Sequence, residues 1–279
     1  MLQYSLRVAK RFFVLIPGII TAVVSVHTIF PYFDRRLPLA VAVLATYILG
    51  AYILIPALIR GVRVLFPARH LPLYCVTPDG FASDPLNIGL IGTRRQLIRA
   101  MEAAGWYMAD PLTPRHMVRV ILHALFQQTY HTAPVSGLYL FGRKQDLAFA
   151  LPLSGGRGHR RHHVRFWATT YDEGKRLSFQ RIHWHHRAAH VSGDKLLWVG
   201  AASLDSGISL VRHNLQVTHM INPDTDQERQ LIIDQLTKAG RIGPITTVKL
   251  GAAYRVVNRV WRGYLHTDGK MAVAHLKLK

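Results

Sequence analysis

Histidine and arginine side chains crowd between residues 155 and 190, and these side chains can bind metal ions, transfer protons or hold phosphate groups. The crowd contains Arg157, His159, Arg160, Arg161, His162, His163, Arg165, His183, His185, His186, Arg187 and His190. Three interpretations fit this stretch: a metal site, a pocket for an anion, and a basic loop solvated beside an anionic membrane surface.

A metal site would use the imidazole nitrogens of His163 and His185, with Asp205 or His219 completing the ligand set. The spacing is poor support for it, because the chain has no HExxH and no CxxC element. Side chains of adjacent residues on a strand point to opposite faces, so His162 and His163 would not bind one ion together. We therefore assign no metal ligand and no cofactor from the sequence.

An anion pocket would use the same residues together with local glycines. Arginine donates two parallel hydrogen bonds to a phosphate, and Gly155-Gly156 lets backbone N–H groups approach its oxygens. Along residues 163–167, alternation places Val164 and Phe166 in the core and the other three side chains on a polar face that suits a cleft wall. The residues predicted to contact the ligand are Arg161, His162, Arg165, Trp167 and Arg229.

Acid–base catalysis is the alternative use of these side chains. His163 or His219 would transfer the proton, and Asp205 or Asp224 would orient the imidazole or share a metal ion with it. The predicted catalytic residues are His163, Asp205 and His219, and Asp205 can also pair with Arg165. Signatures of nucleophiles and phosphate loops are missing, since there is no GxSxG and no GxxxxGK[ST].

The charge of the chain favours anionic partners. It has 35 Lys and Arg against 15 Asp and Glu, a formal net charge of +20, and residues 70–279 alone carry 27 basic and 14 acidic side chains. Such a balance favours anionic lipid, nucleic acid or phosphorylated ligands. Nucleic acid is the disfavoured partner, because the chain has apolar membrane segments and no recognisable reading motif. Cys75 is the only cysteine, so no internal disulfide can form.

Two long apolar runs near the N-terminus predict a membrane anchor. Residues 12–33 and 37–59 contain no charged side chain, and each run can cross a hydrocarbon core about 30 Å thick. We expect residues 1–66 to form a two-helix transmembrane hairpin and residues 67–85 to form a juxtamembrane linker. Three Lys and Arg precede the first apolar run, three follow the second and two lie between the runs, which predicts a cytoplasmic location for the remaining chain.

The elements that would position the site do not alternate regularly. Helices are expected over residues 94–104, 114–128 and 224–239, and strands over residues 138–141, 147–151, 163–168, 196–203, 208–217, 245–257 and 271–278. The first two strands should form a hairpin, and the second helix should bury a side made of Met117, Val120, Ile121, Ala124 and Leu125. This order predicts an α+β domain over residues 86–279, with a mixed or antiparallel sheet and about three helices.

Helix start and stop signals flank two of these helices. Thr93 opens the first and Gly105 closes it, while the segment Asn222-Pro223-Asp224 opens the third and Gly240 closes it. Thr267-Asp268-Gly269 is a turn signal before the last strand.

Short motifs in the second part of the chain carry a resemblance. They are DPLNIGLIG at 84–92, AGW at 104–106, LFGR at 140–143, DLAF at 146–149, RHHVRFW at 161–167, WVGAAS at 198–203 with Asp205, then His219, Asp224, Asp226, ER at 228–229 and TDG at 267–269. In this order the chain resembles the LssY C-terminal domain family of bacteria across nearly all of residues 75–279. Met220 stands where the family pattern prefers a second histidine, and residues 183–190 look like an insertion.

The resemblance implies a setting rather than a reaction, because the family has no established biochemical activity. Its domain is often joined to membrane proteins, including phosphatidic-acid-phosphatase-type and DedA-type modules, which implies lipid or envelope work at the bacterial inner membrane. The phosphatase signatures of those neighbours, a PSGH element and a paired Arg-His-Asp set, are missing here.

The sequence thus supports three hypotheses of function. In the first, the anchored basic domain binds an anionic ligand, a phosphate-bearing lipid or envelope precursor. In the second, it hydrolyses a phosphorylated or lipid substrate with the histidines and aspartates named above, with or without a metal ion. In the third, it is a structural part of a larger membrane complex, with small residues such as Ala45 and Gly50 packing the hairpin against other spans.

Overall fold

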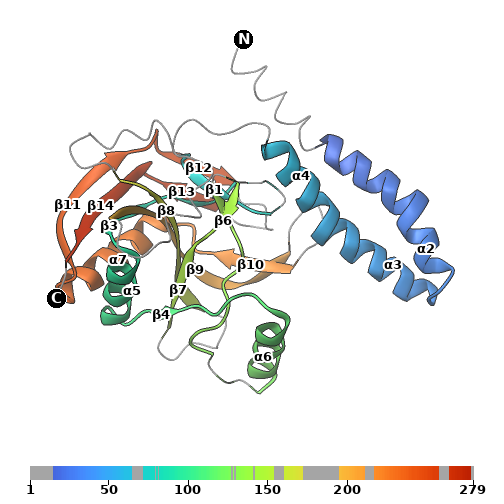
Figure 1. Cartoon of the computed structure of the whole chain (residues 1–279), viewed down its shortest axis with the longest axis horizontal. Coiled ribbons are helices and arrows are strands. Elements are labelled where there is room, and N and C mark those ends of the chain that lie inside the picture. Colours follow the sequence, from blue (N-terminus) through green and yellow to red (C-terminus); the bar gives the residue numbers. More distant parts are fainter. Residues whose placement is uncertain are drawn as a thin grey trace, which may run out of the picture. The chain divides into compact units, whose positions relative to one another are not determined.

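The structure is a computed structural model of the chain, and it describes residues 15–64, 72–78, 80, 82–126, 128, 130–140, 142–153, 160–171, 195–210, 217–257 and 264–277 (Figure 1). The chain divides into two compact units, which are described separately. The first contains Met1–Pro67 and Val76–Phe81, and the second contains Ala68–Cys75 and Ala82–Lys279.

Two apolar helices dominate the first unit. They cover Leu15–Asp34 and Leu39–Ile59, and both are long and apolar enough to cross a membrane. Only 17% and 28% of their most apolar stretches are buried, whereas the core helix of a soluble protein is mostly buried. Their labelled parts are α2 (Phe30–Asp34), α3 (Leu39–Ile48) and α4 (Ile55–Val64), with π-helical turns at Ser25–Ile29 and Leu49–Leu54. The helices support membrane association of the chain.

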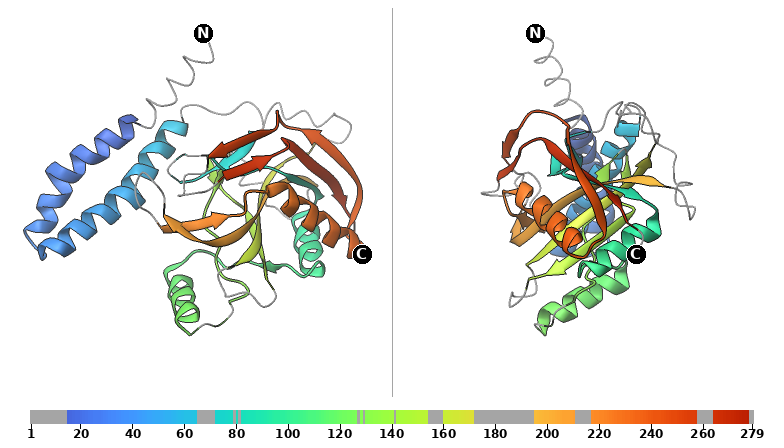
Figure 2. Two further views of the ribbon diagram at one scale, coloured as in Figure 1. Left: turned by 180° about the vertical axis from the view of Figure 1, so that it is seen from behind. Right: turned by 90° about the vertical axis from the view of Figure 1, so that its left-hand side faces the viewer.

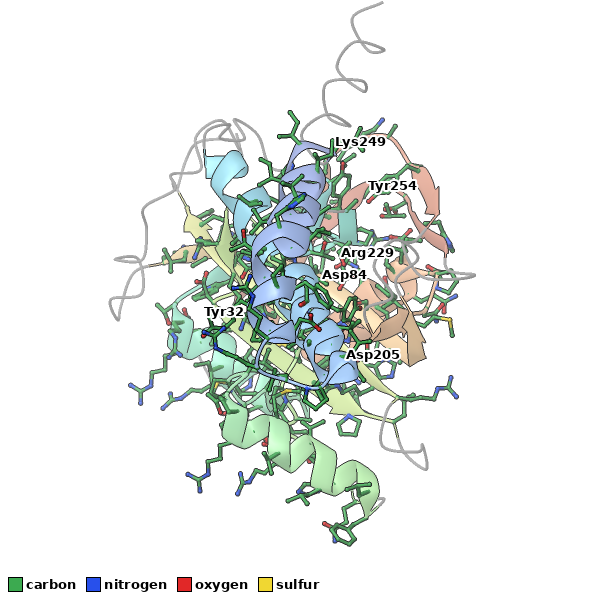
Figure 3. The ribbon with its side chains drawn as sticks, turned by 90° about the vertical axis from the view of Figure 1, so that its right-hand side faces the viewer. Tyr32, Asp84, Asp205, Arg229, Lys249 and Tyr254 are labelled. Atoms are coloured by element: carbon green, nitrogen blue, oxygen red, sulfur yellow. The ribbon has the colours of Figure 1, made fainter. Side chains whose placement is uncertain are left out.

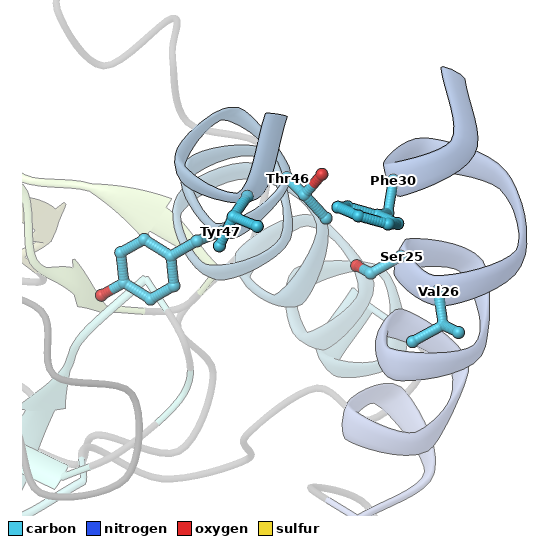
Figure 4. Close-up of a pocket in the computed structure, with 6 residues that line it drawn as sticks. Ser25, Val26, Phe30, Thr46 and Tyr47 are labelled. Carbon is cyan, nitrogen blue, oxygen red and sulfur yellow. The ribbon is translucent and has the colours of Figure 1, made fainter. Parts of the chain in front are cut away.

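The two helices pack against each other through a small residue. A Cβ atom built on Gly50 would lie 3.1 Å from Oγ of Ser25, so the glycine lets the two helices approach closely at this point. Gly50 therefore lies at the contact inside the hairpin, and packing of the hairpin against other spans stays a prediction. Ser25 also lines a cavity of about 310 Å³ together with Val26, Phe30, Val43, Thr46 and Tyr47 (Figure 4).

A large mixed sheet forms the framework of the second unit (Figure 2). Its strand order is β11-β14-β3-β9-β8-β7-β4, and β10 also pairs with β9. Only the pairing of β14 with β3 is parallel. The strands are β3 (Ile88–Gly92), β4 (Tyr107–Met108), β7 (Leu147–Pro152), β8 (Arg161–Thr170), β9 (Leu196–Leu210), β10 (Val217–Ile221), β11 (Ile242–Lys249) and β14 (Lys270–Leu276).

A smaller four-stranded sheet has the order β2-β1-β5-β6. Its strands are β1 (Tyr74–Val76), β2 (Ala82–Pro85), β5 (Tyr139–Leu140) and β6 (Arg143–Lys144), and a separate pair joins β12 (Tyr254–Val257) to β13 (Tyr264–Thr267). Residues 67–85 were expected as a linker, but β1 and β2 lie within them. β1 forms because Tyr74 and Val76, an aromatic and a β-branched residue that both favour strands, flank the buried Cys75.

Helices and the small sheet cover opposite faces of the large sheet. Leu97, Met101, Ile232 and Leu236, from α5 (Arg94–Ala103) and α7 (Thr225–Lys238), pack into one core with residues of β3, β8 and β9. Cys75 and Leu140 of the small sheet join the second core on the other face. The strands β8 and β9 are therefore buried on both sides. With α6 (Pro114–Leu125), the described domain has three helices and confirms the predicted α+β class.

Three strand predictions were wrong. The expected hairpin of residues 138–141 with 147–151 does not form, because β5 pairs with β6 while β7 pairs with β8 in the other sheet. The expected strand at 196–203 forms but continues as β9 to Leu210, so the separate strand expected at 208–217 is wrong: its first residues end β9, and β10 begins at Val217. The expected strand at 245–257 is divided into β11 and β12. Alternation of apolar and polar residues predicts a strand but does not predict which strand it pairs with.

The predicted helix ends are confirmed. Thr93 and Gln96 form a reciprocal capping box at the start of α5, and Asp224 accepts hydrogen bonds from two backbone N–H groups at the start of α7. Gly105 and Gly240 have positive φ angles of 87° and 66° just beyond the ends of these helices.

Helix α6 forms where the sequence predicts it, but its expected buried side is wrong. Met117 is 42% exposed and Leu125 is 71% exposed. The helix protrudes from the rest of its unit in all three ribbon views (Figures 1 and 2). Of the predicted side, Val120 is partly buried, whereas the tertiary structure leaves Met117 and Leu125 uncovered.

Candidate functional site

Five polar side chains meet between the two sheets of the second unit, and we call them the buried polar cluster. They are Asp84 of β2, His163 and Arg165 of β8, and Ser203 and Asp205 of β9, each between 0% and 4% exposed. Alternation and register bring the last four together: odd-numbered residues of β8 and β9 share one face, and His163 lies directly opposite Ser203. Asp84 and Asp205 are labelled in Figure 3.

Asp84 is the acceptor at the centre of the cluster. Its Oδ2 accepts hydrogen bonds from Nη1 of Arg165 and from Oγ of Ser203, both at 2.8 Å, and its Oδ1 accepts one from Ser83 at 3.0 Å. Burial alone would raise the pKa of Asp84, but its contacts with His163 and Arg165 outweigh burial and lower that pKa. The carboxylate is therefore ionised and neutralised inside the domain.

His163 lies between two carboxylates. Its Nε2 is 2.8 Å from Oγ of Ser203 and 3.7 Å from Oδ2 of Asp84, and its Nδ1 is 3.3 Å from Oδ1 of Asp205. Burial opposes the charged form of His163, but the carboxylate of Asp205 and the contact with Asp84 outweigh burial and raise its pKa. A protonated ring also fits the hydrogen bonds, because Ser203 donates to Asp84 and its oxygen then accepts from Nε2–H.

The two arginines on this face are engaged by the protein itself. Arg165 donates from Nε and Nη2 to the carbonyl and hydroxyl oxygens of Ser136, both at 3.0 Å, in addition to its bond with Asp84. Arg161 donates to the carbonyl oxygens of Ala133 and Pro134, both at 2.8 Å. The nearest carboxylate to Arg161 is that of Asp205, at 3.6 Å. These bonds fasten residues 133–136 over the cluster.

The sequence predicted parts of this arrangement incorrectly. The face of β8 with His163, Arg165 and Trp167 was expected to be a polar surface, but all three side chains are buried because the small sheet covers it. Trp167 is 0% exposed and its Nε1 donates to the carbonyl oxygen of Arg143 at 3.3 Å. Asp205 was expected to pair with Arg165, which pairs instead with Asp84.

The remaining predicted residues lie away from the cluster. His162 points to the opposite face of the sheet, where its Nδ1 is 2.7 Å from Oε2 of Glu228 on α7. Arg229, labelled in Figure 3, donates to both carboxylate oxygens of Asp268 at 2.9 and 3.1 Å. Asp224 caps α7.

Some predicted residues fall outside what the structure describes. His219 lies on β10, opposite Ile208 in the register with β9, but the structure describes only its backbone. Gly155-Gly156 and the histidines at 183–190 also lie outside the described residues.

Two members of the buried polar cluster, Asp84 and Ser203, were not predicted as site residues from the sequence. Asp84 comes from the stretch expected as a linker, and Ser203 ends a run of small residues that resembles ordinary core strand. A signal for Ser203 did exist, since a strand that places a histidine and an arginine inside the protein needs polar partners on the neighbouring strand. Nothing local indicated that Asp84 supplies the countercharge, 81 residues before Arg165.

No metal centre is apparent in the part of the chain that the structure describes, where no group of three or more His, Cys, Asp or Glu residues could hold an ion. The buried polar cluster has two carboxylates near His163, but Arg165 adds a positive charge beside them. A cation would have to displace that arginine or tolerate its repulsion.

The surface of the described domain is much more basic than its composition suggests. Its carboxylates face inward: Asp84, Asp205 and Glu228 are at most 5% exposed. Among the described residues of this unit, only Glu102 and Asp234 are exposed acids. The exposed basic side chains in the described part of this unit number twelve: Arg94, Arg95, Arg99, Arg115, Arg119, Lys144, Arg160, Lys195, Lys238, Lys249, Lys270 and Lys277.

Comparison with known proteins places the chain in one family. A family model described as the LssY C-terminus matches residues 68–271, which is most of the chain and nearly all of the second unit. Searches of curated proteins and of solved structures gave no match. The family match agrees with the motifs of β3, β8 and β9, and the two apolar helices supply the membrane setting. The chain therefore belongs to the LssY C-terminus family and is a membrane-associated member of it.

Proposed function

We propose that the second unit binds an anionic, phosphate-bearing lipid surface or envelope precursor, on the cytoplasmic side of a bacterial inner membrane. The observation that carries this proposal is the surface charge, with twelve exposed Lys and Arg against two exposed Asp and Glu among the described residues. Each basic residue near an anionic membrane contributes about 1 kcal/mol to binding. A few cations acting together are sufficient for stable contact.

The buried polar cluster supports this surface indirectly. It holds the acids Asp84 and Asp205 inside the domain and fastens residues 133–136 to β8, so carboxylates that would repel an anion are withdrawn from the surface. Direct ligand contacts by Arg161, His162, Arg165, Trp167 and Arg229 stay a prediction. In the structure their polar groups are bonded to the protein.

The experiment measures how closely the domain approaches its own bilayer. The full chain, carrying a donor dye at Thr237→Cys on the exposed side of α7, is placed in nanodiscs that contain an acceptor lipid. Cys75 is buried, so the dye reacts at the new thiol. Energy transfer should rise when phosphatidylglycerol is added to phosphatidylcholine and fall as salt is raised from about 0.1 M to about 0.5 M. Equal transfer in both lipids would overturn the proposal.

A charge variant tests the surface itself. Replacing Arg94, Arg95 and Arg99 of α5 by Gln should reduce the phosphatidylglycerol-dependent rise in energy transfer, because three exposed cations are lost. The control Ala103→Gln introduces the same side chain at an exposed position of α5 without removing a charge. Competition by soluble glycerol phosphate distinguishes recognition of a free phosphate from recognition of a lipid surface.

One observation favours hydrolysis as a second candidate. Ser203, His163 and Asp205 lie in the order of a nucleophile, a base and an orienting acid, with distances of 2.8 and 3.3 Å. To act as the base, His163 would first have to release the proton that it holds between the two carboxylates, and Ser203 would have to turn its hydroxyl from Asp84 to Nε2. Ser203 is 0% exposed and shares its hydroxyl with Asp84, so substrate would reach it only after residues 133–136 move. His219, whose side chain lies outside the described residues, stays a predicted member of this site, whereas Asp224 caps α7.

A covalent probe decides this candidate. The full chain is treated with a fluorophosphonate and assayed with generic acyl and phosphate esters. Labelling and turnover that disappear in Ser203→Ala but persist in Ser136→Ala would establish a serine hydrolase, because Ser136 contacts Arg165 rather than His163. An unlabelled, inactive chain would leave the cluster with a structural role.

A further inference from the structure

Helix α6 is attached to the domain by its polar side. His116 Nδ1 is 2.8 Å from the carbonyl oxygen of Pro111 and 3.0 Å from Oγ1 of Thr113. The ring of His123 stacks on Tyr130 with 4.9 Å between ring centroids. Tyr130 in turn donates to Oδ2 of Asp110 at 2.6 Å. The histidines of the helix thus face the chain segments that flank it.

The apolar side of α6 faces away from the protein. Val118, Leu122 and Leu125 follow the spacing of one helical side and are 55%, 46% and 71% exposed. Leu112 before the helix and Phe126 after it are also apolar and exposed, at 48% and 70%. An uncovered apolar side of this kind is typical of a binding surface. Burial of each 100 Å² of apolar area would contribute about 2.5 kcal/mol of favourable free energy.

The chemistry of the helix indicates what covers it. Arg115 and Arg119 are exposed, and α6 contains no acidic residue. The nearest acid in the preceding loop, Asp110, is occupied by hydrogen bonds from Tyr130 and Thr132. Apolar residues on one side with arginines beside them are typical of helices that lie in the membrane interface. The same chain carries two apolar helices of membrane-crossing length.

We propose that α6 is an interfacial membrane helix: the side formed by Val118, Leu122 and Leu125 inserts among lipids, while Arg115 and Arg119 lie at the head groups. The domain thus makes a second membrane contact besides the helical hairpin. This contact does not depend on anionic lipid, because burial of apolar side chains also occurs in a neutral bilayer.

The test uses the full chain, one copy to a nanodisc of pure phosphatidylcholine. An environment-sensitive dye is attached at Val118→Cys or Leu125→Cys, with Arg119→Cys as the control on the same helix and Thr237→Cys as the control on α7. Lipids that carry a spin label in their acyl chains quench a dye that enters the bilayer. Quenching at Leu125 should exceed quenching at Arg119 by about threefold or more, since an interfacial helix buries only its apolar side.

Two results would overturn the proposal. A blue-shifted dye that lipid spin labels do not quench would show that another segment of the same chain covers α6, since each nanodisc holds one copy. A dye that reports water at both Val118 and Leu125 would show that nothing covers it. Quenching in pure phosphatidylcholine without any effect of phosphatidylglycerol on energy transfer would retain this inference and refute the anionic-lipid proposal.

A functional variant completes the test. The double substitution Leu122→Glu and Leu125→Glu should lower energy transfer from a donor dye at Thr237→Cys to an acceptor lipid in pure phosphatidylcholine, because two inserted side chains become charged. Both positions are exposed, so circular dichroism should remain that of the unmodified chain. Unchanged energy transfer in the folded variant would contradict insertion.

Discussion

The buried polar cluster and helix α6 reverse the usual distribution of side chains. Between the sheets, charged groups such as Arg165 and Asp84 are 4% and 1% exposed, whereas Leu125 of α6 is 71% exposed. The cluster is tolerated inside because each charge has a partner within the protein. The apolar side of α6 has no partner of this kind among the described residues. The contrast teaches that a side-chain pattern defines two faces of an element, and the surroundings decide which face is covered.

Removal of one charge from the cluster should have the largest effect on stability. Arg165→Ala would leave the carboxylate of Asp84 buried without its arginine, at a cost of about 3–5 kcal/mol. Chemical unfolding of the full chain in detergent, followed by tryptophan fluorescence, measures this because all five tryptophans follow residue 105. The exposed Arg99→Ala is the matched control and should change stability by less than about 0.5 kcal/mol. Similar losses for both variants would show that the cluster does not hold the domain together.

A core leucine of α5 should come next. Leu97 is 0% exposed and packs between α5 and the large sheet, so Leu97→Ala should cost about 2–5 kcal/mol through lost burial and a cavity. The same unfolding measurement applies. A cost below about 1 kcal/mol would indicate that α5 is less tightly packed than the structure shows.

The cluster should also make stability depend on pH. Because the folded-state pKa of His163 is raised, its contribution is fully present below its unfolded pKa of about 6.5 and is lost as pH rises through the folded pKa. Each unit of that shift contributes about 1.4 kcal/mol. The lowered pKa of Asp84 acts in the opposite range, so its contribution is present above the unfolded pKa and is lost as pH falls through the folded pKa.

Unfolding titrations at several pH values check the histidine contribution. His163→Gln should remove the loss of stability on the alkaline side. The control His275→Gln, at an exposed position of β14, should retain the loss of stability on the alkaline side. Identical pH profiles for the unmodified chain and His163→Gln would refute a buried, charged imidazole.

The smallest effect is expected on α6. Leu125→Ala should change the stability of the detergent-solubilised chain by less than about 0.5 kcal/mol, because the side chain contacts little of the protein. Leu97→Ala serves as its matched comparison, since both replace a leucine on an amphipathic helix. A loss at Leu125 as large as at Leu97 would mean that α6 packs on the protein in solution.

The accuracy of the sequence predictions follows the range of the interactions involved. Thr93 and Asp224 cap helices with hydrogen bonds that span two or three residues, and both helix starts were predicted. The hairpin predicted for residues 138–141 failed because β5 pairs with β6 rather than with β7, and alternation does not indicate which neighbouring strand becomes the partner. Within the site, His163, Arg165 and Asp205 were predicted together, while Asp84 and Ser203 were missed.

The sequence by itself determined the two apolar helices, the caps of α5 and α7, the α+β class and the family, because uncharged runs, capping residues and short motifs are local properties of the chain. Only the tertiary structure decided that Asp84 meets Arg165 and that α6 turns its apolar side outward. The physical reason is that sheet pairing and burial depend on contacts between residues far apart in the sequence. A helix or strand pattern specifies which residues share a face, but the rest of the fold determines what that face meets.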